Sequence, residues 1–126
     1  MLLACVEDEE HVIGLYGAAL RLASWGLRTV ELGARTPAAA LSEAVASVKP
    51  DAVGLSVVIA PEPSRVAAMV SAYADACGAL PWFVGGAGAA GVREAVTRRG
   101  GLVVGEDLAG ARGAIEAALA RRASRA

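Results

Sequence analysis

The one histidine of the chain, His11, lies in a short acidic segment that directly follows an apolar run. The apolar run is residues 2–6, the acidic segment is residues 7–10, and an apolar helical pattern follows His11. An imidazole can ligate a metal through one nitrogen while a carboxylate accepts a hydrogen bond from the other, which fixes the tautomer. Glu9, two residues before His11, is placed to be that carboxylate.

The elements that must position this segment alternate between strands and helices. Short apolar runs typical of buried strands predict strands at 2–6, 28–32, 52–58, 82–84 and 102–104. Helical spacing of apolar residues, with start and stop signals, predicts helices at 11–25, 37–49, 64–77, 92–99 and from 108 onward.

Five strand–helix units with short connections predict an α/β fold, a single domain over residues 1–126 with a doubly wound parallel sheet. We expect the flavodoxin-like (Rossmann-like) strand order 2-1-3-4-5, which opens a crevice at the carboxyl ends of strands 1 and 3. His11 follows strand 1, Ser56 ends strand 3, and Gly85-Gly86 follows strand 4. Each of these features alone is weak, but the topology brings all three to the same edge.

The helices carry further expectations about caps and buried faces. Thr36, followed by Pro37, and Asp107 are predicted helix caps. Apolar spacing predicts that the later helices bury Leu41, Val45, Val48, Val66, Met69, Val70, Tyr73, Cys77, Leu108, Ala111, Ile115 and Leu119. The first helix has two apolar stripes, one with Ile13, Tyr16, Leu20 and Ala23 and the other with Val12, Leu15, Ala19 and Leu22. We therefore expect it to pack on the sheet and to face a further cover or partner.

Composition narrows the class of protein. A net charge of −1 and a hydrophobic content of 56% give no electrostatic reason to expect direct binding of nucleic acid or of an anionic membrane. No apolar stretch is long enough for a membrane span, and the first apolar run has no basic region before it, as a signal peptide would. Cys5 and Cys77 are expected to be buried free thiols, which fits the cytoplasm.

Several chemistries can be weighed at this edge. A phosphate site disfavours an acidic first turn. A phospho-accepting receiver domain requires an Asp after strand 3 and a Lys after strand 5, where this chain has Ser56 and Gly105. A serine hydrolase requires a Gly-x-Ser-x-Gly elbow, which Ser56 lacks. One histidine is too few for a metal held by protein alone. It is enough for a metal that a macrocycle already holds.

The pattern Glu9-x-His11-x-x-Gly14, with Ser56-x-Val58 and Gly85-Gly86, resembles the Asp-x-His-x-x-Gly, Ser-x-Leu and Gly-Gly motifs of cobalamin-binding domains. The resemblance covers nearly the whole chain. It implies that cobalamin binds base-off and His-on, with His11 as the ligand of cobalt. The cofactor-binding residues that it implies are Glu9, Glu10, His11, Val12, Gly14, Ser56, Val58, Gly85, Gly86 and Ala87. The chain departs from the motifs at Glu9, where Asp is usual, and at Val58, where Leu is usual.

The Glu-x-His form looks most like the cobalamin-binding domains of MerR-type light-sensing transcriptional regulators. That resemblance implies a non-catalytic domain that binds adenosylcobalamin or methylcobalamin, with a helical cap domain or partner protein over the upper cobalt face. A homo-oligomer is also possible. The alternative is the corrinoid-carrying subunit of a methyltransferase or mutase. A third possibility is an interaction module that has lost the cofactor.

Overall fold

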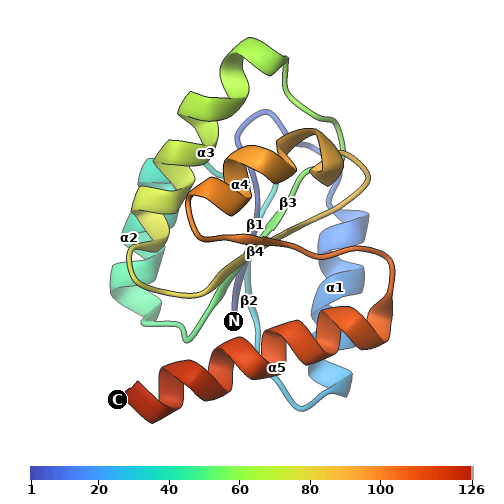
Figure 1. Cartoon of the computed structure of the whole chain (residues 1–126), viewed down its shortest axis with the longest axis vertical. Coiled ribbons are helices and arrows are strands. Elements are labelled where there is room, and N and C mark those ends of the chain that lie inside the picture. The colour runs from blue at the N-terminus through green and yellow to red at the C-terminus, as the bar shows by residue number, and fades with distance from the viewer. Residues whose placement is uncertain (126) are drawn as a thin grey trace.

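The computed structural model describes residues 1–125, which form a five-stranded sheet with helices on both faces (Figure 1). The strands are β1 (Leu2–Cys5), β2 (Val30–Gly33), β3 (Val53–Ser56), β4 (Trp82–Gly85) and β5 (Leu102–Val103). The helices are α1 (Ile13–Ser24), α2 (Ala38–Val48), α3 (Pro63–Cys77), α4 (Arg93–Arg98) and α5 (Leu108–Arg125), with a 3₁₀ helix at Ala89–Val92. Every predicted strand and helix is present.

The sheet has the predicted order, β2-β1-β3-β4-β5, and every neighbouring pair of strands is parallel. The loops that follow β1, β3 and β4 therefore leave from the same edge of the sheet. The register sets Cys5 beside Ser56, and Ser56 beside Gly85. The ends of the three central strands are thus level with one another.

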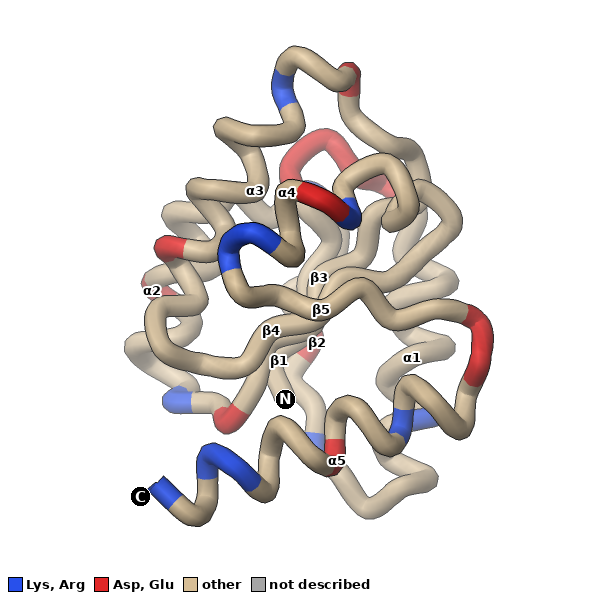
Figure 2. Tube along the Cα trace, in the orientation of Figure 1, with Lys and Arg blue, Asp and Glu red and all other residues tan. Residues whose placement is uncertain are grey.

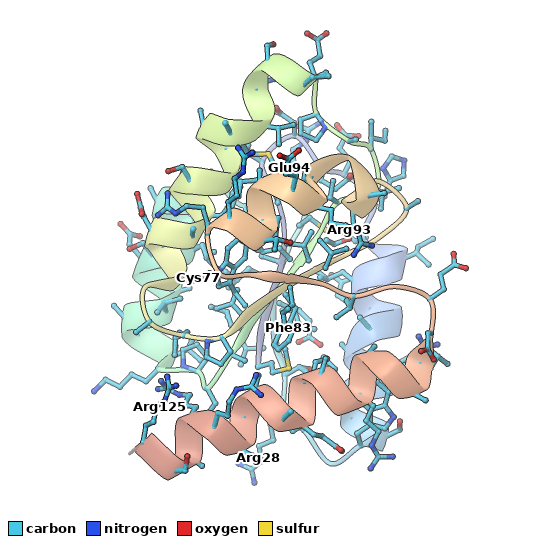
Figure 3. All side chains as sticks on the ribbon, in the orientation of Figure 1. Arg28, Cys77, Phe83, Arg93, Glu94 and Arg125 are labelled. Carbon is cyan, nitrogen blue, oxygen red and sulfur yellow. The ribbon has the colours of Figure 1, made fainter. Side chains whose placement is uncertain are left out.

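The two faces of the sheet have separate cores, because successive residues of a strand point to opposite faces. The core under α2, α3 and α4 contains Leu2, Ala4, Val6, Leu41, Val53, Leu55, Val57, Val70, Tyr73, Ala74, Cys77, Trp82, Val84, Ala89, Val92 and Val96. The core under α1 and α5 contains Leu3, Cys5, Leu15, Ala19, Leu22, Ala52, Phe83, Ile115 and Ala118. Figure 3 labels a residue from each, Cys77 on α3 and Phe83 on β4. Both cysteines are buried free thiols, as predicted.

Three predictions about helix ends and faces were wrong. Thr36 does not cap α2: its hydroxyl donates to the Gly33 carbonyl, and Pro37 occupies the cap position in an extended conformation. Val48 is exposed because it is the last residue of α2, beyond the edge of the core. Leu108 is 45% exposed, because α5 first contributes buried side chains at Ile115, about two turns further on.

One side of α1 packs on the sheet and the other faces outward. Leu15, Ala19 and Leu22 are buried, whereas Ile13 is 87% exposed and Leu20 is also exposed. The second predicted stripe is therefore the inner one, and nothing in residues 1–125 covers the first. Within the same residues, no helix is both long and apolar enough to cross a membrane.

Candidate functional site

The loop between β1 and α1 forms the centre of the candidate site, at the carboxyl edge of the sheet. Asp8 has a φ of 66°, the left-handed conformation that turns the chain sharply after β1. The turn directs the Glu9 side chain inward, where it is 3% exposed, and leaves the His11 side chain 57% exposed. The loop thus places a buried carboxylate directly beside an accessible imidazole.

The Glu9 carboxylate joins two loops that lie far apart in sequence. Its Oε1 accepts hydrogen bonds from the backbone N–H groups of Val58, at 2.6 Å, and Ile59, at 2.8 Å. Its Oε2 lies 2.7 Å from Nδ1 of His11 and 3.3 Å from the His11 backbone nitrogen, which donates to it. Burial raises the pKa of Glu9, but these hydrogen bonds outweigh burial and hold the pKa below its usual value.

The ionised Glu9 determines how the His11 ring can act. A carboxylate only accepts hydrogen bonds, so Nδ1 of His11 carries a proton and the lone pair of the neutral ring lies on Nε2. The His11 carbonyl also accepts a hydrogen bond from the Cys5 thiol at 3.6 Å. The ring is therefore fixed at one nitrogen and available as a metal ligand at the other. The extra methylene of Glu9 does not prevent this contact.

The remaining acidic residues form exposed ion pairs around this centre. Figure 2 shows them as the red run that follows β1. Arg65, in the first turn of α3, pairs with Asp8 at 3.4 Å and with Glu7 at 3.9 Å. Glu10, predicted to bind the cofactor, pairs with Arg35 and is exposed. These pairs connect the loop with its neighbours, and Glu9 alone of the four acidic residues is buried.

A buried tyrosine beneath the loop supports it from the α3 side. The Tyr73 hydroxyl accepts a hydrogen bond from the Glu7 backbone N–H at 2.6 Å and donates to the Thr36 carbonyl at 2.5 Å. Burial raises the pKa of Tyr73 to about 12. The sequence pattern predicts Tyr73 as core but gives no sign of its polar partners, because those are backbone groups of distant loops.

The predicted glycine segment lies against the loop that follows β3. Gly86 has a φ of +110°, and a Cβ on it would lie 2.4 Å from the Val57 carbonyl oxygen. A Cβ on Gly88 would lie 2.6 Å from the Ala60 nitrogen. The backbone packing of this chain therefore already requires glycine at both positions, and sequence reasoning missed Gly88. Ala87, between them, is exposed.

Small residues occupy the α1/α5 side of the three central strand ends. Cys5, Ser56 and Gly85 stand in one row across β1, β3 and β4. Gly85 is partly exposed, as is Gly54, one row further in on β3. A Cβ on Gly14, at the start of α1, would meet no atom within 4 Å. Space is therefore free at the start of α1, whereas Val104 lies against Gly85 and Leu3 lies against Gly54.

The other predicted site residues, Val12, Val58 and Ser56, make fewer contacts within the site. Val12 precedes α1 and packs partly against the core under α1 and α5. Val58 contributes its backbone N–H to Glu9, and its side chain is partly buried. Ser56 is buried, and its hydrogen bond with the Cys5 thiol partly offsets the rise in the Cys5 pKa caused by burial and by Glu9.

No group of three or more His, Cys, Asp or Glu side chains in residues 1–125 could hold a metal ion. A hollow of about 390 Å³ lies at the opposite edge of the sheet, lined by Met1, Gly26, Leu27, Arg28, Val30, Val48, Pro50, Asp51 and Leu119. It includes none of the predicted site residues.

Comparisons with known proteins agree with these features. No protein-family model matches the chain. The HTH-type transcriptional repressor CarH of Myxococcus xanthus is 44% identical over 88 residues, which are 69% of this chain and 29% of the repressor. The repressor CarA of the same organism is 43% identical over 88 residues, which are 70% of this chain and 31% of that protein. The chain thus spans less than a third of the length of these curated relatives.

The structural comparison points to the same kind of domain. The crystal structure of a cobalamin-binding protein from Desulfitobacterium hafniense DCB-2 matches with a TM-score of 0.63 and 26% sequence identity. The match covers 80% of this chain and 50% of that one. The predicted fold and the resemblance to cobalamin-binding domains are therefore confirmed.

Proposed function

We propose that this domain binds cobalamin base-off, with Nε2 of His11 as the lower axial ligand of cobalt, and that it does so in a regulatory protein. The observation that carries the proposal is the His11 ring, which Glu9 contacts at Nδ1 and which is exposed over more than half of its side chain. Cobalamin supplies a cobalt ion already held by the four nitrogens of the corrin, so one protein nitrogen is sufficient. The donor set of this chain fits that requirement.

The free space at Gly14, three residues after His11, also supports the proposal. A base that cobalt has released must lie elsewhere, together with the nucleotide tail that carries it. The row of Cys5, Ser56 and Gly85 offers small side chains at the carboxyl ends of the central strands. We assign the tail to this α1/α5 side, with Gly14 leaving room at the start of α1.

A regulatory role is favoured over a carrier role by the relatives, because both curated matches are transcriptional repressors. In such a protein the domain would bind the cofactor without catalysis, and a partner or a cap would cover the exposed side. The bound form would be adenosylcobalamin or methylcobalamin. A corrinoid carrier would instead show turnover when mixed with a methyltransferase or mutase partner.

The histidine count makes a specific test possible. Because His11 is the one histidine, growth on ¹⁵N-labelled histidine labels the ring of this residue and of no other. The purified protein is loaded with cobalamin, desalted and reduced to the cobalt(II) state, and its EPR spectrum is recorded. A His11 ligand converts the nitrogen splitting from the ¹⁴N triplet to the ¹⁵N doublet, whereas the cofactor's own base would leave the triplet unchanged.

A pair of variants serves as the control. His11→Ala and His11→Gln remove the ligand from a largely exposed position, so both should fold and lose the doublet, with some loss of stability because the buried Glu9 carboxylate loses one hydrogen-bond partner. Failure of the wild-type protein to retain any corrin after desalting would contradict cobalamin binding. A persistent triplet in the labelled wild-type protein would be compatible with cobalamin binding but would contradict the assignment of His11 as the ligand.

A further inference from the structure

The position of Glu9 depends on the loop that follows β3. Both hydrogen bonds to its Oε1 come from backbone N–H groups of consecutive residues, Val58 and Ile59. Both N–H groups can reach the same oxygen, at 2.6 and 2.8 Å, only while the backbone of that loop keeps its present conformation. Any displacement of the loop would therefore move Glu9, and with it the Nδ1 contact to His11.

The β3 loop is in turn held by the backbone that follows β4. The Gly88 N–H donates to the Val57 carbonyl at 2.9 Å, and the Val57 N–H donates to the Gly85 carbonyl at 2.9 Å. A Cβ on Gly88 would lie 2.6 Å from the Ala60 nitrogen and 2.9 Å from the Val58 carbonyl oxygen. Glycine at this position is what lets the two loops approach closely enough for these bonds.

We propose that Gly88 is a positioning residue for the axial ligand, acting on His11 through the Val58–Ile59 loop and Glu9. This inference rests on the proposed function, since it concerns how His11 is presented to cobalt. It assigns the glycine segment a role within the protein, in addition to any contact with the nucleotide tail. Gly88 acts solely by fixing the conformation of the neighbouring backbone, without touching the cofactor.

Gly88 is a better probe of this role than Gly86. Gly88 has φ −90° and ψ 0°, which an alanine also adopts, so Gly88→Ala adds a steric contact without backbone strain. Gly86 has a φ of +110°, which would be strained for any other residue whatever the space. Replacing Gly86 would therefore mix the two effects.

The first experiment compares Gly88→Ala with Gly101→Ala. A Cβ on Gly101 would lie 2.7 Å from the Trp82 ring, a similar overlap that is separate from the Glu9 network. Both variants should lower the melting temperature. Only Gly88→Ala should weaken the ¹⁵N doublet of labelled His11 and lower cobalamin affinity, by about 10- to 100-fold, the range for loss of a partner that orients a metal ligand.

A milder pair of substitutions covers the case in which Gly88→Ala does not fold. A Cβ on Gly91 would lie 2.8 Å from the Ala60 Cβ, so Gly91→Ala presses on the same loop through a side chain. Ala60→Gly removes the methyl group that it meets. Gly91→Ala should reduce the doublet, and the double variant Gly91→Ala/Ala60→Gly should restore it towards the level of Ala60→Gly alone.

The outcomes separate this inference from the proposed function. A wild-type doublet with unchanged doublets in Gly88→Ala and Gly91→Ala would overturn the positioning role and leave cobalamin binding intact. Equal loss of the doublet in Gly88→Ala and Gly101→Ala would also overturn it, because general destabilisation would then be the cause. Absence of the doublet in the wild-type protein would count against the His11 ligand itself.

Discussion

The two faces of the sheet use alternate residues of the same strands, yet they are covered to different degrees. On the α2/α3/α4 side, β3 and β4 present Val53, Leu55, Trp82 and Val84, all buried. That face encloses a void of about 10 Å³, barely enough for one water molecule. On the α1/α5 side the same strands present Gly54, Ser56, Phe83 and Gly85, of which both glycines are partly exposed.

The difference separates what holds the fold from what receives a ligand. Large side chains on one face supply most of the apolar burial, which is the main favourable contribution to folding. The other face has small residues near the edge where His11 lies, and there Leu3 and Val104 lie against Gly54 and Gly85. The candidate site thus lies on the side of the sheet that contributes less to the core, and substitutions on the two sides should have separable effects.

The largest expected effect comes from Leu55→Ala on the filled face. Leu55 is buried and borders the small void, so removing its side chain should enlarge a cavity and cost about 2–5 kcal/mol of unfolding free energy. Its neighbour in β3, Ser56, points to the other face, and Ser56→Ala should cost about 1 kcal/mol or less. Urea unfolding monitored by circular dichroism measures both.

Equal costs for the two substitutions would contradict the proposed difference between the faces. The pair is informative because Leu55 and Ser56 are neighbours in one strand and represent the large side chains of one face and the small side chains of the other. Cobalamin retention adds a second measurement. We expect Ser56→Ala to lower the amount of cobalamin that the protein retains, because Ser56 belongs to the face on which the nucleotide tail is proposed to lie. The unfolding free energy should change little.

An intermediate effect is expected from Tyr73→Phe, which removes the hydroxyl beneath the site loop. The Glu7 N–H would lose its acceptor and the Thr36 carbonyl its donor, at a cost of about 1–3 kcal/mol. Thermal or urea unfolding checks this value. Tyr16→Phe is the matched control, because Tyr16 is the other tyrosine, is exposed, and should lose almost no stability.

The raised pKa of Tyr73 also predicts how the stability of the fold changes with pH. The folded pKa is raised to about 12, above the value near 10 expected in the unfolded chain. The stability that this shift provides is therefore fully present below about pH 10 and is lost as the pH rises towards 12. Wild-type protein and Tyr16→Phe should both show this loss, and Tyr73→Phe should show a smaller one, because burial also raises the pKa of Cys77 to about 12 in all three proteins. A loss of the same size in Tyr73→Phe would assign the alkaline effect to another group.

The sequence predicted the fold well because the signals for it are local. Buried strands, helix stops such as Gly26 and Gly78, and short connections are all visible within a few residues. The strand order then follows from general rules of α/β topology. The predicted Thr36 cap was wrong because α2 begins one residue later, with Pro37 at the cap position, so that the Thr36 hydroxyl donates to the Gly33 carbonyl and accepts from no helix N–H.

The sequence predicted which loops form the site, but it did not predict the hydrogen bonds that join those loops. The spacing of Glu9 and His11 suggested their contact, but the anchoring of Glu9 by Val58 and Ile59 depends on residues about fifty positions later in the chain. The need for glycine at Gly88 likewise comes from the backbone of another loop. Such contacts follow from the assembled sheet and leave no local pattern in the sequence.

The smallest effect on stability, and the sharpest test of the open side, is expected from Gly14→Ala. Gly14 is the second residue of α1, and a Cβ there would meet no atom of the described chain within 4 Å. Alanine should therefore leave the fold unchanged or stabilise it by up to about 0.5–1 kcal/mol through helix propensity. If the start of α1 approaches the corrin, the added methyl group should nevertheless lower cobalamin affinity by about tenfold, or about 1.4 kcal/mol.

Gly17→Ala is the control for Gly14→Ala, because Gly17 lies about one turn further along the same helix and is equally open. Both variants gain the same methyl group and nearly the same helix propensity, so a difference in affinity between them measures proximity to the ligand alone. Titration of each protein with cobalamin, followed by the visible spectrum, gives that difference. If Gly14→Ala binds as tightly as Gly17→Ala, the corrin does not approach the start of α1, and the open space at that point serves no binding role. A selective loss in Gly14→Ala would place the cofactor on the α1/α5 side, where the strands offer glycine and serine in place of leucine and tryptophan.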